Sequence, residues 1–306
     1  MIRLEDLAKL ADENRADLKI PVNTFEVGGK SISWDKNPAT MGVINFSSES
    51  WYRESVCLNN DMALKRARIL KSQGADFLDI GVESTLEYAQ IVTGAEQIKS
   101  IEPFLKSCFE EEIPISIESY HTKVIEKSLE LGASIINLTG NTFNEDIYKI
   151  VSDFDAAVIL CFVDGPDVRN VGELSILDNP IPSLVDYFER CLELAQKQGV
   201  RKIFIDPGMG FYYSNIKDSR KRIHYQTSIF LESFRLRKLG FPICHALPHA
   251  FECFGDEVRS SEAYFAVLAT LGGANLLRTH EIPKIKAVLE TMNAFSGLKN
   301  NMAEGL

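Results

Sequence analysis

Single polar residues follow short apolar segments at several places along the chain. The clearest case is Asp206, which ends the apolar run 203–205 and is followed by Pro207-Gly208. Carboxylate, amide, guanidinium and imidazole groups gathered in one place can hold a ligand through hydrogen bonds and charge. The residues in this position are Asn45, Asp79, Glu118, Asn137, Asp206, Arg278 and His280.

The apolar segments before these residues are typical of strands buried in a parallel sheet. We place eight strands, with helical patterns between most neighbours. Eight βα units in one α/β chain favour a closed (β/α)8 TIM barrel over an open sheet, and the polar strand ends would then share one mouth. The strands begin near residues 40, 76, 113, 134, 156, 202, 241 and 275, and the clearest helices, each stopped by a glycine, are 61–73, 121–131, 182–197 and 260–271.

Residues 1–38 are predicted to form an N-terminal helix and a β-hairpin ahead of the barrel. Leu4, Leu7 and Leu10 have the spacing of a short amphipathic helix, and Gly28-Gly29 joins two alternating runs. We expect the hairpin to cover the closed end of the barrel. The barrel is placed at 39–295, a C-terminal tail at 296–306, and a long mobile loop at 211–224.

The composition is that of an ordinary globular protein. The 306 residues carry a formal net charge of −10, which argues against nucleic-acid binding because phosphate groups need clustered Lys and Arg. The six cysteines include no C-x-x-C pair, so neither a zinc knuckle nor a redox pair is indicated. No segment approaches the roughly 20 apolar residues of a membrane span, and no signal peptide is evident. We therefore expect a cytoplasmic protein without membrane contact.

Six short segments between residues 41 and 292 carry a more specific signal. In order they contain Met41-Gly42-Val43-Ile44-Asn45, Asp79-Ile80-Gly81-Val82-Glu83-Ser84-Thr85, Ser116-Ile117-Glu118, Ile135-Ile136-Asn137, Asp206-Pro207-Gly208-Met209-Gly210-Phe211 and Arg278-Thr279-His280-Glu281. Together they resemble dihydropteroate synthase, the pterin-binding (β/α)8 barrel of folate synthesis. Each segment is weak alone, and the six in order are specific for the superfamily.

The resemblance implies a transferase that joins p-aminobenzoate to a hydroxymethyl-dihydropterin pyrophosphate, with Mg²⁺ present. Asn45, Arg278 and His280 match the family residues that hold the pyrophosphate, and Asn45 would also be a Mg²⁺ ligand. An arginine fork with a nearby imidazole suits that charge. A salt bridge from Arg278 to Glu281 or to another carboxylate of the mouth is the alternative, which we rank second. The resemblance also implies a homodimer formed through residues 260–271 and 283–292.

The pterin itself would bind through the remaining polar strand ends. A pterin presents an amino group and a ring N–H side by side, so one carboxylate can accept two parallel hydrogen bonds. Asp206 is the first choice for this role, although an aspartate before Pro-Gly also commonly shapes a turn. Asn137 offers a donor and an acceptor to the rest of the ring. The other predicted substrate-binding residues are Glu118, Asp79, Ser84 and Thr85.

The chain departs from the family pattern at four places. Glu118 stands where the family has Asp, and Leu138 follows Asn137 where the family has Asp. Leu86-Glu87 replaces Arg-Pro, and Leu247-Pro248-His249 replaces Ser-Arg-Lys. Three positive charges are lost, so a p-aminobenzoate carboxylate would find little to neutralise it. We expect His249 to take a catalytic role in place of the lysine, with His245 as the other histidine of that strand end.

The leading hypothesis is a dihydropteroate synthase-like transferase with an altered amine pocket. One alternative is a corrinoid methyltransferase acting on methyl-tetrahydrofolate, which needs no pyrophosphate site; the retained Arg278 and His280 weigh against it. A second alternative is a non-catalytic pterin-binding protein. All three share a small-molecule pterin ligand, and fold resemblance does not choose among them.

Overall fold

The computed structural model describes residues 2–33, 37–47, 52–84, 91–170, 172–174, 176–210, 216 and 218–303. For Phe251 and residues 295–303 it describes the backbone alone. In this part of the chain, no helix is both long enough and apolar enough to cross a membrane.

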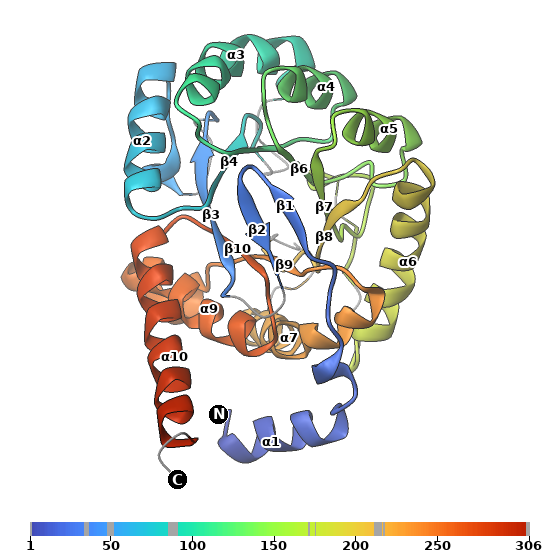
Figure 1. Cartoon of the computed structure of the whole chain (residues 1–306), viewed down its shortest axis with the longest axis vertical. Helices are drawn as coiled ribbons and strands as arrows, with labels where there is room; N and C mark the ends of the chain where they lie inside the picture. The colour runs from blue at the N-terminus through green and yellow to red at the C-terminus, as the bar shows by residue number, and fades with distance from the viewer. Residues whose placement is uncertain are drawn as a thin grey trace.

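Eight parallel strands form the centre of the molecule (Figure 1). Strand β8 is also bridged to the segment before β9 through Ile205 and Ile243, so the sheet closes on itself. The sequence-based prediction of a (β/α)8 barrel is confirmed. The strands are β3 (Ala39–Asn45), β4 (Phe77–Gly81), β5 (Ile115–Glu118), β6 (Ile135–Leu138), β7 (Ala157–Cys161), β8 (Lys202–Asp206), β9 (Cys244–Ala246) and β10 (Leu276–Thr279).

Helices surround the barrel in the order expected of βα units. The four helices predicted from the sequence correspond to α2 (Asn60–Ser72), α4 (Thr122–Glu130), α6 (Ile181–Lys197) and α9 (Ser261–Leu271). The others are α3 (Gly94–Glu110), α5 (Glu145–Asp153), α7 (Ser219–Glu232), the short α8 (Phe251–Phe254) and α10 (Ile282–Ala303). Helix α10 continues across the boundary at residue 296 that the sequence suggested for a tail.

The predicted loop at 211–224 is wrong in its second half. Helix α7 begins at Ser219, and the side chain of Asp218 accepts hydrogen bonds from the backbone N–H groups of Arg220 and Lys221. An N-terminal cap of this kind satisfies donors that the first turn leaves open. Arg220, Lys221 and Arg222 therefore lie at the start of a helix. Residues 211–215 and 217 lie outside the described part.

The two faces of the strands have different neighbours. Ile80, Ile117, Ile136, Val158 and their equivalents pack outward against the helices. The inward residues near the beginning of the strands form a separate apolar cluster. Because side chains alternate along a strand, the residue two positions further on also points inward. The inward cluster consists of Met41, Phe77, Ile135, Ala157, Ile159, Phe204, Cys244 and Leu276, joined by Val27 and Ile32.

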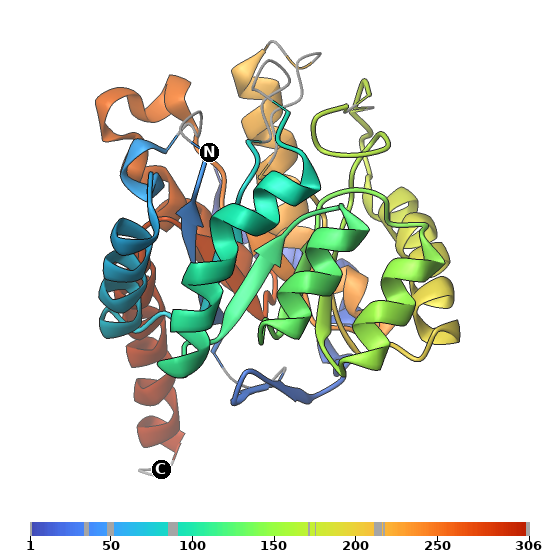
Figure 2. The same cartoon turned by 90° about the horizontal axis from the view of Figure 1, so that it is seen from above.

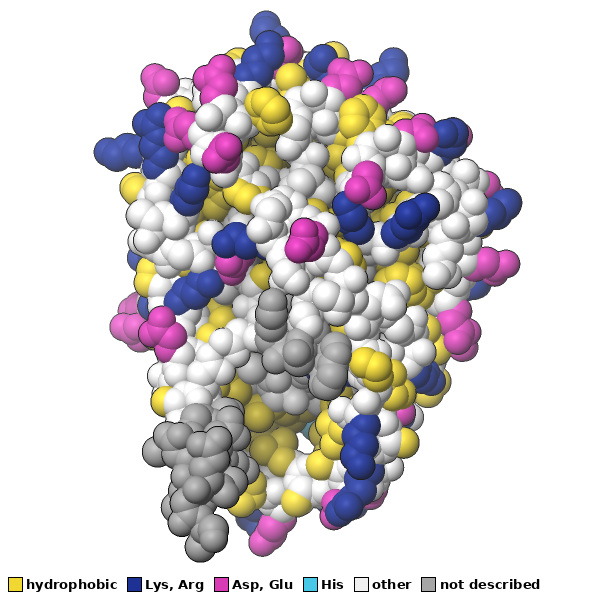
Figure 3. Space-filling view, in the orientation of Figure 1, with side chains coloured by type: hydrophobic (Ala, Val, Ile, Leu, Met, Phe, Trp, Pro, Cys, Tyr) yellow, Lys and Arg dark blue, Asp and Glu magenta, His cyan; other side chains and the backbone are white. Residues whose placement is uncertain are grey.

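Val27 and Ile32 belong to the hairpin of β1 (Phe25–Val27) and β2 (Lys30–Ile32). Both are buried and pack in the inward cluster. The hairpin lies across the end of the barrel at which the strands begin (Figure 2). The hairpin thus closes this end, as expected. On the face that carries it, acidic and basic side chains are interspersed (Figure 3). The preceding helix, α1 (Leu4–Glu13), forms as predicted but contains no buried residue.

His245 is a core residue and not part of the mouth. It lies on β9, is fully buried, and its ring stacks on Phe230 of α7 at 4.3 Å between centroids. Neither ring nitrogen has a hydrogen-bond partner among the described residues. Burial lowers the pKa of His245 to about 3, so the imidazole is neutral in the folded protein.

We expect His245→Leu to make the protein more resistant to acid. The folded pKa of His245 lies below its unfolded value of about 6.5, so its contribution to stability is present above pH 6.5 and lost as the pH falls toward 3. Between pH 7.5 and pH 5 the wild type should lose about 2 kcal/mol more unfolding free energy than the variant. Urea unfolding at both pH values measures this difference. Equal losses in the two proteins would mean that His245 takes up a proton in the folded state.

Candidate active site

An arginine between two carboxylates lies at the mouth of the barrel. Arg278 lies near the end of β10 and points inward, and its Nε lies 2.6 Å from Asp79 Oδ2 of β4. Its Nη2 donates to Glu118 Oε2 of β5. The side chains of Asp79 and Glu118 are 0% and 9% exposed, and that of Arg278 is 18% exposed. Removing one member of such a buried ion-pair group destabilises the protein, because it leaves an uncompensated buried charge.

Asp79 connects this group to two further strands. Its Oδ1 accepts a hydrogen bond from Ser116 Oγ at 2.6 Å, and its Oδ2 accepts one from Asn137 Nδ2 at 3.1 Å. Burial raises the pKa of Glu118, while the charge of Arg278 acts in the opposite direction. The structure therefore brings four predicted site residues into direct contact: Asp79, Glu118, Asn137 and Arg278.

The alternative ranked second for Arg278, an ion pair with a carboxylate of the mouth, is present in the structure, with carboxylates other than Glu281. Two of them hold it, and the extra methylene of Glu118, relative to the aspartate of the family, is part of the side chain that reaches Nη2. Glu281 instead contacts Arg259 and the hydroxyl of Tyr52. The other N–H groups of the Arg278 guanidinium remain as donors for an anion, because a guanidinium carries five.

Asp206 shapes a turn and also lies at the mouth. Its Oδ1 accepts the N–H of Gly208 at 2.8 Å, and its Oδ2 accepts the N–H of Ala246 at 3.3 Å. Gly208 has a φ of +76°, and a Cβ there would collide with the carbonyl oxygen of Phe162. Burial raises the pKa of Asp206 to about 6, although these two N–H groups and Arg278 lower it. The turn-forming role is thus real, and a carboxylate has lone pairs left for a ligand.

A second cluster joins His249 and His280 through a residue that the sequence did not single out. Glu262 lies in the first turn of α9 and is fully buried. Its Oε1 is 2.8 Å from His280 Nδ1 and 3.1 Å from His249 Nε2. The two histidines hold the pKa of Glu262 well below its usual range against the effect of burial, and burial lowers the pKa of His280.

Tyr52 connects the histidine cluster with Asn45. Its ring stacks on His280 at 4.3 Å and on His249 at 5.4 Å between centroids. The carbonyl oxygen of Tyr52 accepts a hydrogen bond from Ser55 Oγ at 2.7 Å. Ser55 Oγ in turn accepts a hydrogen bond from Asn45 Nδ2 at 2.7 Å. The expected anion residues Asn45 and His280 are therefore linked, whereas the side chains of Arg278 and His280 have different partners.

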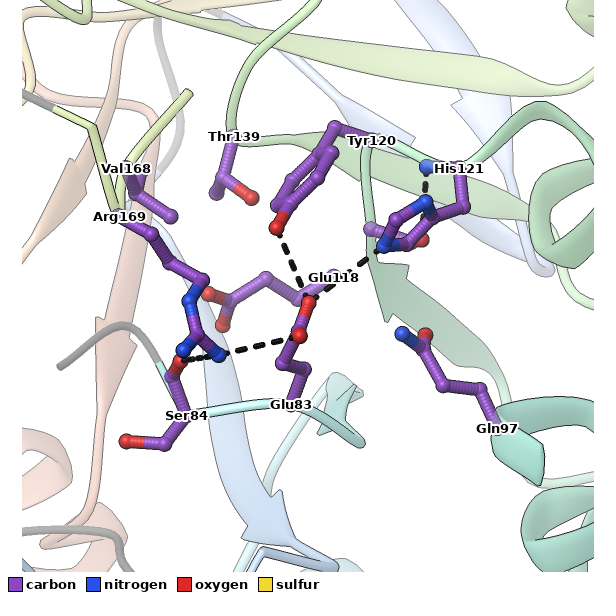
Figure 4. Close-up of a pocket in the computed structure, with 10 residues that line it drawn as sticks. Glu83, Ser84, Gln97, Glu118, Tyr120, His121, Thr139, Val168 and Arg169 are labelled. Atoms are coloured by element: carbon purple, nitrogen blue, oxygen red, sulfur yellow. Dashed lines mark hydrogen bonds and ion pairs between the residues drawn. The ribbon is translucent and has the colours of Figure 1, made fainter. Parts of the chain in front are cut away.

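A small cavity lies beside Glu118, with a volume of about 10 Å³, close to that needed for one water molecule. Figure 4 shows the carboxylate of Glu83 between Arg169 and the pair Tyr120 and His121. Arg169 Nη1 lies 3.0 Å from Glu83 Oε1 and 3.3 Å from the carbonyl oxygen of Ser84. Tyr120 donates to Glu83 at 3.0 Å. Arg169 thus lies beside the second loop, where the sequence suggested a loss of positive charge, but its charge is paired with that of Glu83.

The remaining predictions divide into two groups. Ser84 lines this cavity. Thr85 lies outside the described residues. Glu262, Arg169 and Tyr52 were not predicted from the sequence. The site residues were predicted as polar residues that follow apolar strands, and none of these three follows one. The closing of the barrel brings them to the mouth.

Comparisons with known proteins agree with this fold. Residues 41–280 match the pterin binding enzyme family. Dihydropteroate synthase of Clostridium beijerinckii is 28% identical over 227 residues, which cover 72% of this chain and 77% of that protein. The enzyme of Synechocystis sp. is 25% identical over 280 residues, 88% of this chain and 93% of the relative. This chain belongs to the pterin binding enzyme family.

A solved structure extends the likeness to the whole barrel. Burkholderia cenocepacia dihydropteroate synthase complexed with 7,8-dihydropteroate superposes with a TM-score of 0.76 and 22% identity. The match covers 92% of this chain and 99% of that one. Low identity with full coverage describes a divergent member with the complete fold.

Proposed function

We propose that this chain is a dihydropteroate synthase-like transferase that binds a pterin pyrophosphate at the carboxyl mouth of the barrel. The observation that carries the proposal is the buried set of Asp206, Asp79, Asn137 and Glu118 around Arg278, on inward positions of five different strands. Family membership and the named relatives support it. The homodimer, the cytoplasmic location and the domain boundaries expected from the sequence stay predictions.

The pterin ring would occupy the space above this set. The Asp206 carboxylate accepts the paired N–H groups of the ring, and burial strengthens such a bond because water does not compete. Asn137 is oriented by its bond to Asp79, which directs the amide toward the same space. Glu118 and Asp79 hold the Arg278 side chain in place. Arg278 would help to position the pterin ring and would donate hydrogen bonds to the pyrophosphate.

Asn45, Arg278 and His280 would hold the departing pyrophosphate. The bond that breaks joins the exocyclic carbon of the pterin to a pyrophosphate oxygen; the bond that forms joins this carbon to the amine nitrogen, which then loses a proton. Donors placed at the leaving oxygen stabilise the charge that develops there. His280 is a neutral donor or acceptor in this role, because burial lowers its pKa.

The Asn45 side chain also fits the Mg²⁺ that the family implies. A carboxamide oxygen is a hard ligand of the kind Mg²⁺ takes, and such sites commonly combine one or two protein oxygens with substrate phosphates. The bond from Asn45 Nδ2 to Ser55 fixes the orientation of the amide. When bound, Mg²⁺ would neutralise part of the pyrophosphate charge.

We expect turnover of hydroxymethyl-dihydropterin pyrophosphate with p-aminobenzoate, because the chain belongs to the family and its mouth carries the residues proposed to hold the pterin and the pyrophosphate. Product formation by chromatography, with pyrophosphate release as a second readout, measures it. Absence of product at high enzyme concentration, with the pterin still bound, would restrict the protein to pterin binding. Methyl transfer from methyl-tetrahydrofolate to a cobalamin acceptor would favour the methyltransferase alternative instead.

A further inference from the structure

We propose that His249, Glu262 and His280 form a binding site for one divalent transition-metal ion of the Zn²⁺ type, separate from the Mg²⁺ that accompanies pyrophosphate. The three residues come from the segment after β9, the first turn of α9 and the end of β10. One ligand atom from each lies within 4.8 Å of the other two. The site therefore lies where two neighbouring βα units, β9–α9 and β10–α10, meet at the mouth.

The donor set matches known zinc chemistry. Two histidines and one glutamate bind catalytic Zn²⁺ with a fourth position left for water or substrate. With metal–ligand distances of about 2.0–2.2 Å, tetrahedral ligands stand about 3.3 Å apart. Glu262 Oε1 is 2.8 Å from His280 Nδ1 and 3.1 Å from His249 Nε2, so these two pairs need to separate by only a few tenths of an ångström. The ligand atoms of the two histidines lie within 4.8 Å of each other.

The charge of the cluster also favours a cation. Glu262 is fully buried, and among the described residues its ion pairs are with these two histidines alone. No lysine or arginine of the described ranges pairs with it. A buried carboxylate is costly unless a positive charge compensates it. A metal ion between the three ligand atoms supplies that charge and leaves both imidazoles neutral, which is their ligand form.

Neighbouring groups hold the ligands in place. Glu262 Oε2 accepts hydrogen bonds from Thr279 Oγ1 and from the backbone N–H of His280, the latter at 2.9 Å, so Oε1 faces the imidazoles. Tyr52 stacks on both rings. Such outer contacts orient the ligands of metal sites and contribute to affinity. The side chains of His249 and His280 are 16% and 11% exposed, so an ion can enter from the mouth.

The role of the ion rests on the proposed function. The chain has His249 where related synthases have a lysine, and a metal ion held by His249 would restore positive charge at that strand end. Its open position would face the pyrophosphate held by Asn45 and His280. Binding of the metal itself needs no pterin, so the site can be tested independently of the reaction.

The test measures metal affinity in the full-length protein without substrate. After chelator treatment, Zn²⁺ is titrated against a chromophoric chelator, and Co²⁺ is titrated with visible absorption as the readout. We expect one ion per chain, Co²⁺ bands of a four- or five-coordinate site, and about 100-fold weaker binding for His249→Gln or His280→Gln. His224→Ala, at an exposed position of α7, is the matched control and should bind as the wild type does.

Two results would overturn the proposal. In one, the wild type binds Zn²⁺ no more tightly than the double variant H249Q/H280Q. In the other, His224→Ala weakens binding as much as His249→Gln does. Thermal melting of the metal-free variants confirms that they fold, and the partial exposure of both histidines favours this. Pterin titration of the metal-free wild type tests the proposed function separately. Failure of the metal-site proposal is therefore distinguishable from failure of the proposed function.

Discussion

Asp206→Asn is expected to weaken pterin binding by about 100-fold, or about 3 kcal/mol, because it replaces a buried anionic acceptor by a neutral amide. The amide can accept one hydrogen bond from the ring, but its NH2 group would face a ring donor. The fold should survive, since burial already raises the pKa of Asp206 and the variant buries no charge. Calorimetric titration with a hydroxymethylpterin at pH 7.5 measures the loss.

Asp155→Asn is the matched control for this substitution. Asp155 forms an exposed ion pair with Lys202 at the opposite end of β8, and its positive φ of 49° suits asparagine. We expect unchanged affinity. The pH dependence gives a second check: the wild type should lose affinity about tenfold per pH unit below about 6, where Asp206 takes up a proton, and Asp206→Asn should lose this dependence. Equal affinity of Asp206→Asn and the wild type would remove Asp206 from the pterin site.

Arg278→Met should lower the unfolding free energy by about 3–5 kcal/mol at pH 8. The substitution leaves Asp79 and Glu118 buried side by side without their cation, and among the described residues Ser116 and Asn137 still donate to Asp79. Denaturant unfolding measures the change. Arg68→Met removes the cation of the exposed pair with Glu111 and should have no measurable effect.

Two further measurements separate charge from packing in Arg278→Met. Adding Glu118→Gln should recover part of the lost stability, because one of the two adjacent buried charges is then absent. Lowering the pH should also reduce the difference in unfolding free energy between the wild type and Arg278→Met. Burial raises the pKa of Glu118, and this pKa rises further without Arg278. Protonation of Glu118 therefore relieves the repulsion as the pH falls. If the loss of unfolding free energy in Arg278→Met changes neither with pH nor on adding Glu118→Gln, the whole effect is due to packing.

Much of the mouth follows from a two-residue alternation that is visible in the sequence. Once β4, β6 and β10 are placed, Asp79, Asn137 and Arg278 lie two positions beyond the inward residues Phe77, Ile135 and Leu276. Their inward direction therefore depends on local pattern alone. Their roles toward a ligand stay predictions.

Partners that come from outside the strands could not be predicted in this way. Glu262 belongs to the helical pattern of α9, and its contacts with His249 and His280 exist only after the βα units pack. Arg169 lies in the segment between β7 and α6, where no periodicity specifies a position. Likewise, Glu118 was predicted as a substrate-binding residue, and its contact with Arg278 exists only in the folded chain.

The most direct test of the account is a crystal structure of the protein with a bound hydroxymethylpterin. We predict the ring in the barrel mouth, with its amino group and ring N–H within hydrogen-bonding distance of the Asp206 carboxylate and with Asn137 at its other polar edge. A ring bound elsewhere on the molecule, or one in the mouth with Asp206 contacting only Gly208 and Ala246, would contradict it.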